Sequence, residues 1–429
     1  MREIVPLPPP PVVRNDVAAI RELFQKNVLT TYSRFNLIWS HGKGSYLWDV
    51  TGKRYLDFGA GIAVCALGHA HHEIAQTLHE QAEKLIHVSN LYYCETQGRL
   101  AEALVRLIGP GKCFFCNSGA EANEGLFKLA RRFGHEEGRF EILTALNSFH
   151  GRTLGGIAAT GQDKVKKGFG PLMDGFRHIP YNDLEAARAA ISPATAAILI
   201  EGVQGETGVI PASPEYLLGL RRLCDEKKLL LLMDEVQSGY FRTGRFQSFQ
   251  RILEGVKDGA GFLPDGIAMS KALGSGFPIG AIWVREPHTE LLNPGSHATT
   301  FGGTPLGCTV ALKSLEVVER EDLAGNARKI GDFLKSELVK CGARHSKVLQ
   351  EVRGIGAMLG IELQPSIPSL TKVDRAYSLQ FIDRLHEAGL LAVPSGTHVI
   401  RFLPPLNLSL REAEEGLGIF ESVVAAVAS

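Results

Sequence analysis

One lysine, Lys271, lies within an apolar stretch that reads IAMSKALGSGFPIGAIW. Apolar residues precede this lysine, and small, turn-forming residues follow it. Its apolar neighbours predict burial, which penalises a charged ammonium group unless its pKa falls. A lysine with a lowered pKa is a nucleophilic amine that can form a Schiff base. Taken alone, however, the stretch favours a lysine that buries only its aliphatic stem and extends the ammonium group to solvent.

Four other segments place polar side chains directly after a predicted strand. Because ligands of open α/β sheets bind at the carboxyl ends of the strands, these segments are candidates for one site. The turn 117–123 opens a helix, where N–H groups and the helix dipole favour a phosphate, although an ordinary N-cap is the commoner reading of such a turn. The loop 148–153 carries an aromatic ring, an imidazole and a guanidinium group. Glu201 and Asp234 each follow an apolar run, and Asp234 is costly to bury unless a cation pairs with it.

Pyridoxal phosphate needs this combination of groups. It takes a lysine for a Schiff base, a carboxylate for its pyridine nitrogen and anion contacts for its phosphate. Each segment alone is a weak signal. Five of them, each following a predicted strand, favour a pyridoxal phosphate site over a lysine that reaches solvent.

The elements that position these groups alternate along the chain. Continuous apolar strands separated by helices predict a mostly parallel sheet covered on both faces. The predicted strands are 112–116, 140–146, 196–201, 229–234, 266–270 and 279–284, and the helices between them include 121–133, 184–190 and 214–227.

The two ends of the chain have shorter elements. A β-hairpin is predicted at 46–49 and 55–58. The C-terminal part has helices at 305–319, 327–340, 374–388 and 409–427, with strands at 348–352, 358–363 and 399–402. We therefore divide the chain into a proline-rich arm (1–16), the N-terminal part of a small domain (17–75), a large cofactor-binding domain (76–315) and the C-terminal part of the small domain (316–429).

Composition limits the class of protein. The chain has 429 residues, 45% of them hydrophobic, and a formal net charge of zero. Balanced charge gives no support for nucleic-acid binding or for an anionic membrane surface. The apolar runs are too short to cross a bilayer, and the N-terminus lacks a secretory pattern. Seven scattered cysteines suit a reduced, cytoplasmic compartment.

The order and spacing of seven motifs resemble those of the class III, or ω-, aminotransferases, which are pyridoxal-phosphate enzymes of fold type I. The resemblance covers the chain from about residue 30 to its end. The motifs are FCNSGAEANE, FHGRT, EGVQGETGV, LLMDEVQSGYFRTG, SKALGSGFPIGA, TTFGGTPLGC and IRFLPPL. The fold expected is α/β, with a large domain built on a mostly parallel seven-stranded sheet covered by helices. A smaller α+β domain is expected from the N-terminal and C-terminal segments.

The resemblance also implies how the cofactor is held. Lys271 is expected to carry pyridoxal 5'-phosphate as a covalent aldimine and to move a proton. Asp234, the second catalytic residue, is expected to keep the pyridine nitrogen protonated. Phe149 stacks on the ring and Gln237 bonds its phenolic oxygen. The phosphate contacts are Ser118, Gly119, Ala120 and, from the neighbouring subunit of a homodimer, Thr300.

Substrate contacts are implied in the same way. Arg152 is expected to bind the substrate carboxylate far from the reacting amine, through a bidentate contact. Arg401 is expected to bind the α-carboxylate of glutamate. Glu206 pairs with Arg401 and masks it when the donor has no α-carboxylate beside the reacting carbon. Thr299 and Tyr32 are weaker candidates.

The implied reaction moves the δ-amino group of N²-acetyl-L-ornithine to 2-oxoglutarate. The products are N-acetyl-L-glutamate 5-semialdehyde and L-glutamate, in arginine biosynthesis. Ile62 stands where family members that use ornithine usually have tyrosine, and its apolar side chain suits an acylated amine. Succinylornithine, ornithine and N-succinyl-diaminopimelate remain alternatives. So does a non-catalytic protein of this fold, although the complete set of charged site residues argues against it.

Other patterns are weaker. Cys113 and Cys116 are unlike a metal site, because residues three apart on a strand face opposite sides. The histidines from His69 to His72 fit the polar start of a helix, and we predict no metal site. The glycines 354, 356 and 360 lack the spacing of a dinucleotide fingerprint. Four residues depart from the family pattern and bear on fine substrate preference: His72, Ser275, Ala298 and Thr304.

Overall fold

The large sheet is the part of the molecule that carries the predicted site segments. The computed structural model describes residues 17–429. Seven strands lie in the order β4-β12-β11-β10-β7-β5-β6. Their bounds are β4 (Gly111–Cys116), β5 (Glu141–Ala145), β6 (Phe176–Ile179), β7 (Thr195–Glu201), β10 (Leu230–Asp234), β11 (Gly266–Met269) and β12 (Gly280–Arg285). Within this sheet only β12 is antiparallel to its neighbours, so the predicted mostly parallel seven-stranded sheet is confirmed.

Successive side chains of each strand point to opposite faces of the sheet. Both faces are apolar, because each one packs into its own hydrophobic core. One core contains Ile198, Leu231 and Ile267, and the other contains Leu199, Leu232 and Ala268. The first core is closed by α4 (Glu95–Ile108), α9 (Pro214–Lys227) and α11 (Pro305–Arg320). The second core is closed by α5 (Gly119–Gly134). Cys113 packs against the first core and Cys116 lies in the second, so the two cysteines point to opposite faces as expected.

Strand β6 was missing from the sequence prediction. Its four residues, Phe-Arg-His-Ile, have a basic side chain and a histidine in the middle. It lies at the edge of the sheet and, within the described part of the chain, pairs with β5 alone, so it needs no continuous apolar run. The pattern used to recognise the central strands therefore could not find it.

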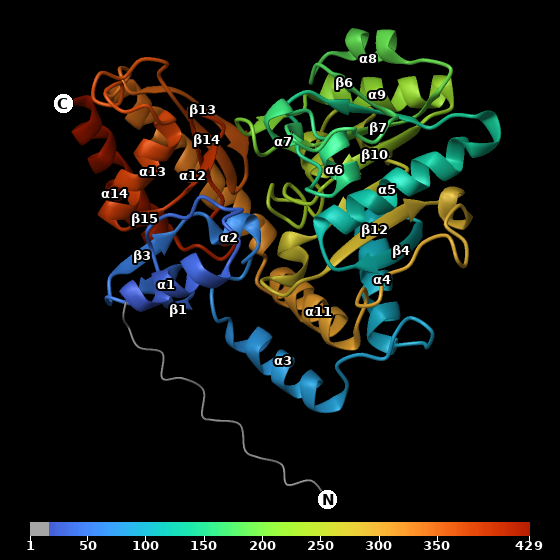
Figure 1. Ribbon diagram of the computed structural model, residues 1–429, viewed down its shortest axis with the longest axis horizontal. Helices are drawn as coiled ribbons and strands as arrows, with labels where there is room; N and C mark the ends of the chain where they lie inside the picture. The colour runs from blue at the N-terminus through green and yellow to red at the C-terminus, as the bar shows by residue number, and fades with distance from the viewer. Residues whose placement is uncertain (1–16) are drawn as a thin grey trace, which may run out of the picture.

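A second body is built from the two ends of the described chain, as predicted. Its main sheet has the order β13-β14-β17-β16 and comprises β13 (Leu349–Ile355), β14 (Met358–Leu363), β16 (Val393–Ser395) and β17 (Val399–Phe402). The N-terminal strands β1 (Trp39–Lys43), β2 (Tyr46–Asp49) and β3 (Arg54–Asp57) form another sheet, in which β3 pairs with β15 (Leu390–Leu391). Figure 1 shows this hairpin beside the C-terminal helices, on the side opposite to β7 and α9.

Three long helices cover the small-domain sheets: α12 (Leu323–Arg344), α13 (Tyr377–Ala388) and α14 (Leu410–Ala428). Helix α12 begins earlier than predicted because the Asp322 side chain caps it by accepting from Gly325 N. The shorter elements are α1 (Val17–Asn27), α2 (Ala60–Ala63), α3 (His72–Lys84), α6 (Leu154–Ala159), α7 (Asp163–Lys166), β8 (Val203–Gln204), α8 (Leu184–Ala190), β9 (Ile210–Pro211) and α10 (Ser248–Ile252). Across residues 17–429, no helix is both long and apolar enough to cross a membrane. The predicted proline-rich arm lies outside the described residues.

The aromatic core that joins the two chain ends gives a stability prediction. Phe58 is fully buried, and its ring lies 5.0 Å from that of Phe402, edge to face. Phe58→Ala removes this contact and leaves a cavity, so we expect a loss of about 3–5 kcal/mol in the free energy of unfolding. The matched control is Phe140→Ala, because the Phe140 side chain is 46% exposed. Urea unfolding followed by circular dichroism measures both variants, and equal midpoints for the two would contradict the prediction.

Candidate active site

A cavity of about 440 Å³ opens at the carboxyl ends of the parallel strands. It collects segments that follow β4, β5, β7, β10 and β11, as the sequence analysis expected. Nine of the twelve predicted site residues line it: Ser118, Gly119, Ala120, Phe149, Arg152, Glu206, Asp234, Gln237 and Lys271.

The turn between β4 and α5 fits a phosphate group. Ser118 caps the helix by accepting from Glu121 N at 3.2 Å. The N–H groups of Gly119 and Ala120, at the start of α5, have no carbonyl partner within the helix. A Cβ atom on Gly119 would lie 2.6 Å from Val236 Cγ1, so this position has no room for a side chain. A bare backbone beside the positive end of a 16-residue helix suits an anion.

Asp234 is held in one orientation by three donors. Asn123 Nδ2 donates to Asp234 Oδ2 at 2.7 Å, and Val236 N donates to Oδ1 at 3.0 Å. His150 Nδ1 lies 2.8 Å from Oδ2, which is hydrogen-bond distance. The side chains of Asp234, Asn123 and His150 are all buried. The carboxylate therefore faces the cavity in a fixed position, as a partner for the pyridine nitrogen requires.

Sequence alone does not indicate the roles of two of these partners. His150 is one of several polar side chains in its loop, and Asn123 ends the turn before Asp234 is reached. The contacts that join them to Asp234 span 84 and 111 positions of the chain. His150 Nε2 is buried and has no hydrogen-bond partner among residues 17–429.

Lys271 stands two residues beyond the end of β11 and borders the cavity. Its backbone is left-handed, with a φ of 48°, which turns the chain sharply at this point. Burial is the largest influence on its pKa and lowers it to about 8, although Glu206, Asp234 and Glu201 act in the opposite direction. A substantial fraction of the Lys271 amine is therefore neutral near physiological pH, which the Schiff-base hypothesis requires.

Arg401 enters the site from β17 of the small domain. Its Nη1 donates to Glu206 Oε1 at 2.9 Å, to Gln237 Oε1 at 2.7 Å and to Gly205 O at 2.6 Å. Gln237 Nε2 also donates to Glu206 Oε1, at 3.3 Å. The predicted pair between Glu206 and Arg401 is thus present. Gln237, which the resemblance assigned to the cofactor ring, bridges the two members of that pair.

Electrostatics keep the carboxylate of Glu206 charged. Burial raises the pKa of Glu206, but Arg401 and Lys271 outweigh this effect and the net pKa lies below its ordinary value. Glu201 differs, because burial and the neighbouring Asp234 raise its pKa well above the ordinary value. Glu201 Oε2 accepts a hydrogen bond from Phe149 N at 3.2 Å. The sequence does not indicate this contact.

The other predicted residues differ in position. Arg152 is exposed at the cavity, with its guanidinium group 5.6 Å from the centre of the Phe149 ring. Thr299 Oγ1 accepts from Asn117 Nδ2 at 3.1 Å, outside the cavity lining. Thr300 is exposed and does not line the cavity of its own chain.

Two weaker candidates also lie outside the cavity lining, Tyr32 and Ile62. Tyr32 is exposed, and Ile62 is 42% exposed in a left-handed turn. Val64, from the same segment as Ile62, does line the cavity. The apolar side chain of this segment that borders the cavity is therefore Val64 and not Ile62.

Ser275, a departure from the family pattern, has a structural explanation. It adopts a left-handed φ of 45°, which glycine would adopt without strain. Its Oγ lies 2.6 Å from Ser314 Oγ, which also receives a hydrogen bond from Tyr240 Oη at 2.6 Å. All three side chains are buried. The hydroxyl chain offsets the backbone strain of a serine beside Lys271.

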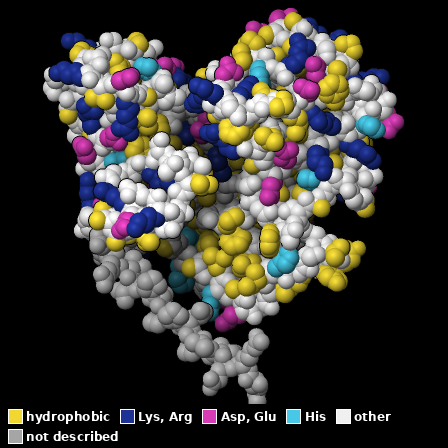
Figure 2. Space-filling model, viewed as in Figure 1, with side chains coloured by type: hydrophobic (Ala, Val, Ile, Leu, Met, Phe, Trp, Pro, Cys, Tyr) yellow, Lys and Arg dark blue, Asp and Glu magenta, His cyan; other side chains and the backbone are white. Residues whose placement is uncertain are grey.

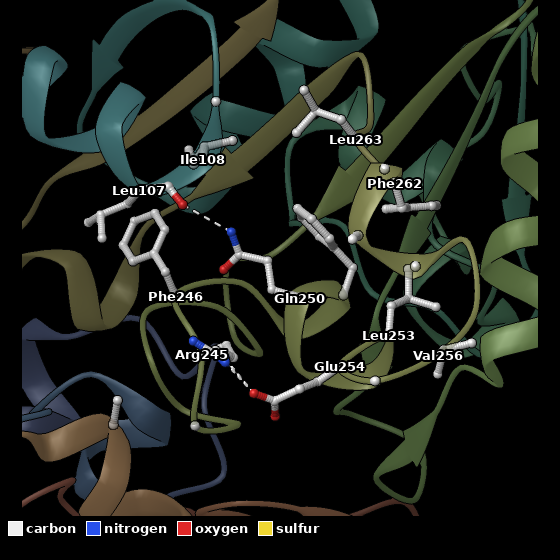
Figure 3. A pocket seen from close by; sticks show the side chains of 18 of the residues that line it. Leu107, Ile108, Arg245, Phe246, Gln250, Leu253, Glu254, Val256, Phe262 and Leu263 are labelled. Atoms are coloured by element: carbon white, nitrogen blue, oxygen red, sulfur yellow. Dashed lines mark hydrogen bonds and ion pairs between the residues drawn. The ribbon is translucent and has the colours of Figure 1, made fainter.

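A larger cavity, of about 1270 Å³, lies away from all the predicted site residues. Figure 3 shows it lined mainly by apolar side chains. Its Arg245 pairs with Glu254, and Gln250 donates to Leu107 O at 2.9 Å. Arg328 pairs with the same Glu254, and Arg285 pairs with Asp265, so these charges are paired with one another and none belongs to the predicted site.

Comparisons with known proteins agree with the motifs. The family model described as aminotransferase class-III matches residues 29–424. A curated acetylornithine aminotransferase of Gloeobacter violaceus is 45% identical over 409 residues, which are 95% of this chain and 98% of that protein. One from Nostoc is 44% identical, over 94% of this chain and 93% of its own.

Solved structures share the fold. The ornithine aminotransferase of Toxoplasma gondii superposes with a TM-score of 0.88 at 30% identity, over 96% of both chains. The acetylornithine aminotransferase of Elizabethkingia anophelis gives 0.82 at 30% identity, over 96% of this chain and 99% of its own.

The lowered pKa of Lys271 predicts an unusually reactive amine. In the cofactor-free protein, acylation of Lys271 should rise with pH to a midpoint near 8, because only the neutral amine reacts. Peptide mass spectrometry after brief labelling across a pH series measures this midpoint, and Lys271→Ala identifies the peptide. A midpoint near the ordinary lysine value of 10.5 would contradict the burial argument.

Proposed function

The chain belongs to the class III aminotransferases, a family of pyridoxal-phosphate-dependent enzymes, and we propose that it moves the δ-amino group of N²-acetyl-L-ornithine to 2-oxoglutarate. The observation that carries the choice of substrate is the likeness to curated acetylornithine aminotransferases from several organisms. Four of them are 41–45% identical over 94–95% of this chain. Solved acetylornithine and ornithine aminotransferases are 29–32% identical to the chain, so the fold alone does not separate the two substrates.

The cavity residues fit the cofactor. When bound, pyridoxal phosphate supplies an aldehyde for the amine and a ring that accepts electrons. We assign Lys271 Nζ as the attachment point and as the group that moves a proton. The Asp234 carboxylate would face the pyridine nitrogen, and Phe149 would cover the ring. Ser118, Gly119 and Ala120 would contact the phosphate from the start of α5.

Two arginines would select the substrates. Arg152 is exposed at the cavity, so its guanidinium group is available for a distal carboxylate, which both substrates carry. Arg401 is neutralised by Glu206. A donor without an α-carboxylate beside its reacting carbon would meet this neutral pair. The α-carboxylate of glutamate would displace Glu206 and take Arg401 for itself.

A homodimer would complete the site. Segment 85–93 lies against segment 299–303. Asn90 Nδ2 donates to Gly302 O at 2.9 Å, and the centres of the His87 and Phe301 rings are 5.4 Å apart. This region exposes Leu85, Ile86, Leu91, Tyr92, Tyr93 and Phe301. Figure 2 shows hydrophobic side chains gathered on the lower part of one face. So much exposed apolar surface favours a protein partner, and a second copy would bring Thr300 of the partner subunit to the phosphate.

The cellular setting is also a proposal. All seven cysteines are unpaired, which suits the reducing cytoplasm. Acetylornithine as substrate places the enzyme in arginine biosynthesis. Succinylornithine and ornithine remain the competing donors, since they differ from acetylornithine only at the α-amine.

A comparison of three donors tests the proposed substrate. With 2-oxoglutarate as acceptor, kcat/KM should be highest for N-acetylornithine, lower for N-succinylornithine and lowest for ornithine. The physical reason is that the α-amine of the donor would lie near the apolar side chain of Val64, which lines the cavity. The charged α-ammonium group of ornithine would lose hydration there without gaining a partner, whereas an acylated amine carries no charge. Ornithine as the best donor would overturn the assignment, and equal values for the two acylated donors would leave only the broader acyl-ornithine specificity.

A further inference from the structure

We propose that Ser395 is a positioning residue that holds the segment carrying Glu206, so that a small-domain strand sets how well Arg401 is masked. This inference rests on the proposed role of Glu206 in distinguishing the two amine donors. It concerns contacts that the motifs do not include.

The hydroxyl of Ser395 spans both ends of the segment. Gly208 N donates to Ser395 Oγ at 2.7 Å, and the same hydroxyl donates to Gly205 O at 2.8 Å. Glu206 and Thr207 lie between these two backbone groups. Ser395 is 1% exposed, so water cannot readily replace either bond. One side chain thus fixes the width of a short loop from both sides.

Ser395 and Arg401 belong to the same rigid frame. Ser395 ends β16, which pairs with β17, and Arg401 lies in β17 opposite Val393. The loop is therefore fixed relative to the arginine that Glu206 neutralises. Arg401 Nη1 also donates to Gly205 O, so Gly205 O receives a hydrogen bond from each strand.

Packing beyond the loop supports the same arrangement. Arg353 Nε donates to Gly208 O at 2.7 Å. Val209 is fully buried with Met358 and Leu403, although its φ of 55° is strained for a β-branched residue. A Cβ atom on Gly360 would lie 2.9 Å from Gly208 O, so β14 touches the loop backbone directly. A strained residue is retained here because small-domain contacts hold the loop in place.

The two members of the ion pair differ in freedom. The Arg401 side chain is 1% exposed, whereas that of Glu206 is 31% exposed. With the loop ends fixed, displacement of Glu206 is confined to its side chain. Without the two hydrogen bonds of Ser395, which we call the clamp, the backbone of the loop 205–208 can move as well, and the Glu206–Arg401 contact weakens. The donor that needs a masked Arg401 would lose most.

The test measures the two half-reactions separately in the holoenzyme, by single-turnover absorbance. One donor is N-acetylornithine and the other is glutamate. Ser395→Ala should lower the ratio of their kcat/KM values about five-fold or more, since two buried hydrogen bonds are lost. Ser395→Cys replaces the hydroxyl with a somewhat larger thiol, which is a much weaker donor, and should shift the ratio in the same direction. Ser378→Ala is the matched control, because this buried small-domain serine donates to Gly396 O and not to the loop.

A double variant separates positioning from general damage. In the Glu206→Ala background, Ser395→Ala should leave the ratio unchanged, because the contact that it positions is already gone. Equal losses in both half-reactions for both Ser395 variants, or a ratio that still shifts in the Glu206→Ala background, would overturn the proposal.

Assays of the wild-type enzyme with each donor separate failure of this proposal from failure of the proposed substrate. If N-acetylornithine is not a donor for the wild type, the substrate proposal fails. The ratio is then measured with N-succinylornithine or ornithine, whichever donor the wild type uses, and the clamp is judged by the same outcomes.

Discussion

The cost of burying charge beside Lys271 governs the architecture of the site. An ammonium group and several carboxyl groups share one small cavity at the carboxyl edge of a sheet. Each carboxyl group has a partner: Arg401 for Glu206, His150 and Asn123 for Asp234, and the backbone N–H of Phe149 for Glu201, whose pKa burial and Asp234 raise. Lys271 is left with a lowered pKa. The nucleophile is therefore a product of its surroundings and not of its own sequence segment.

This balance needs both parts of the molecule. The large sheet supplies Asp234, Glu201 and Lys271 at strand ends, where the chain leaves a fully apolar layer. The small domain supplies Arg401 from β17. The sheet that contains β3 and β15 brings the two ends of the described chain together around the small-domain core. The position of one arginine thus depends on pairing between segments more than 300 residues apart.

Sequence reasoning correctly placed residues at one cavity where each residue directly follows a central strand. Lys271, Asp234 and the turn at Gly119 were found because apolar runs mark the strands and parallel strands end at one edge. Hydrogen bonds between polar side chains that are far apart in the sequence could not be predicted. The contacts of His150 with Asp234, and of Gln237 with Arg401, leave no periodic signal. The role of Thr300 depends on a second chain, so neither the sequence pattern nor one chain's geometry can establish it.

The central claim is that Lys271 binds the cofactor. Borohydride reduction of the holoenzyme fixes pyridoxal phosphate to the lysine that holds it, and peptide mass spectrometry then locates the modified residue. We expect a phosphopyridoxyl group on Lys271 and none elsewhere in stoichiometric amount. Modification of another lysine, or the same yield of modified protein from Lys271→Ala, would contradict it.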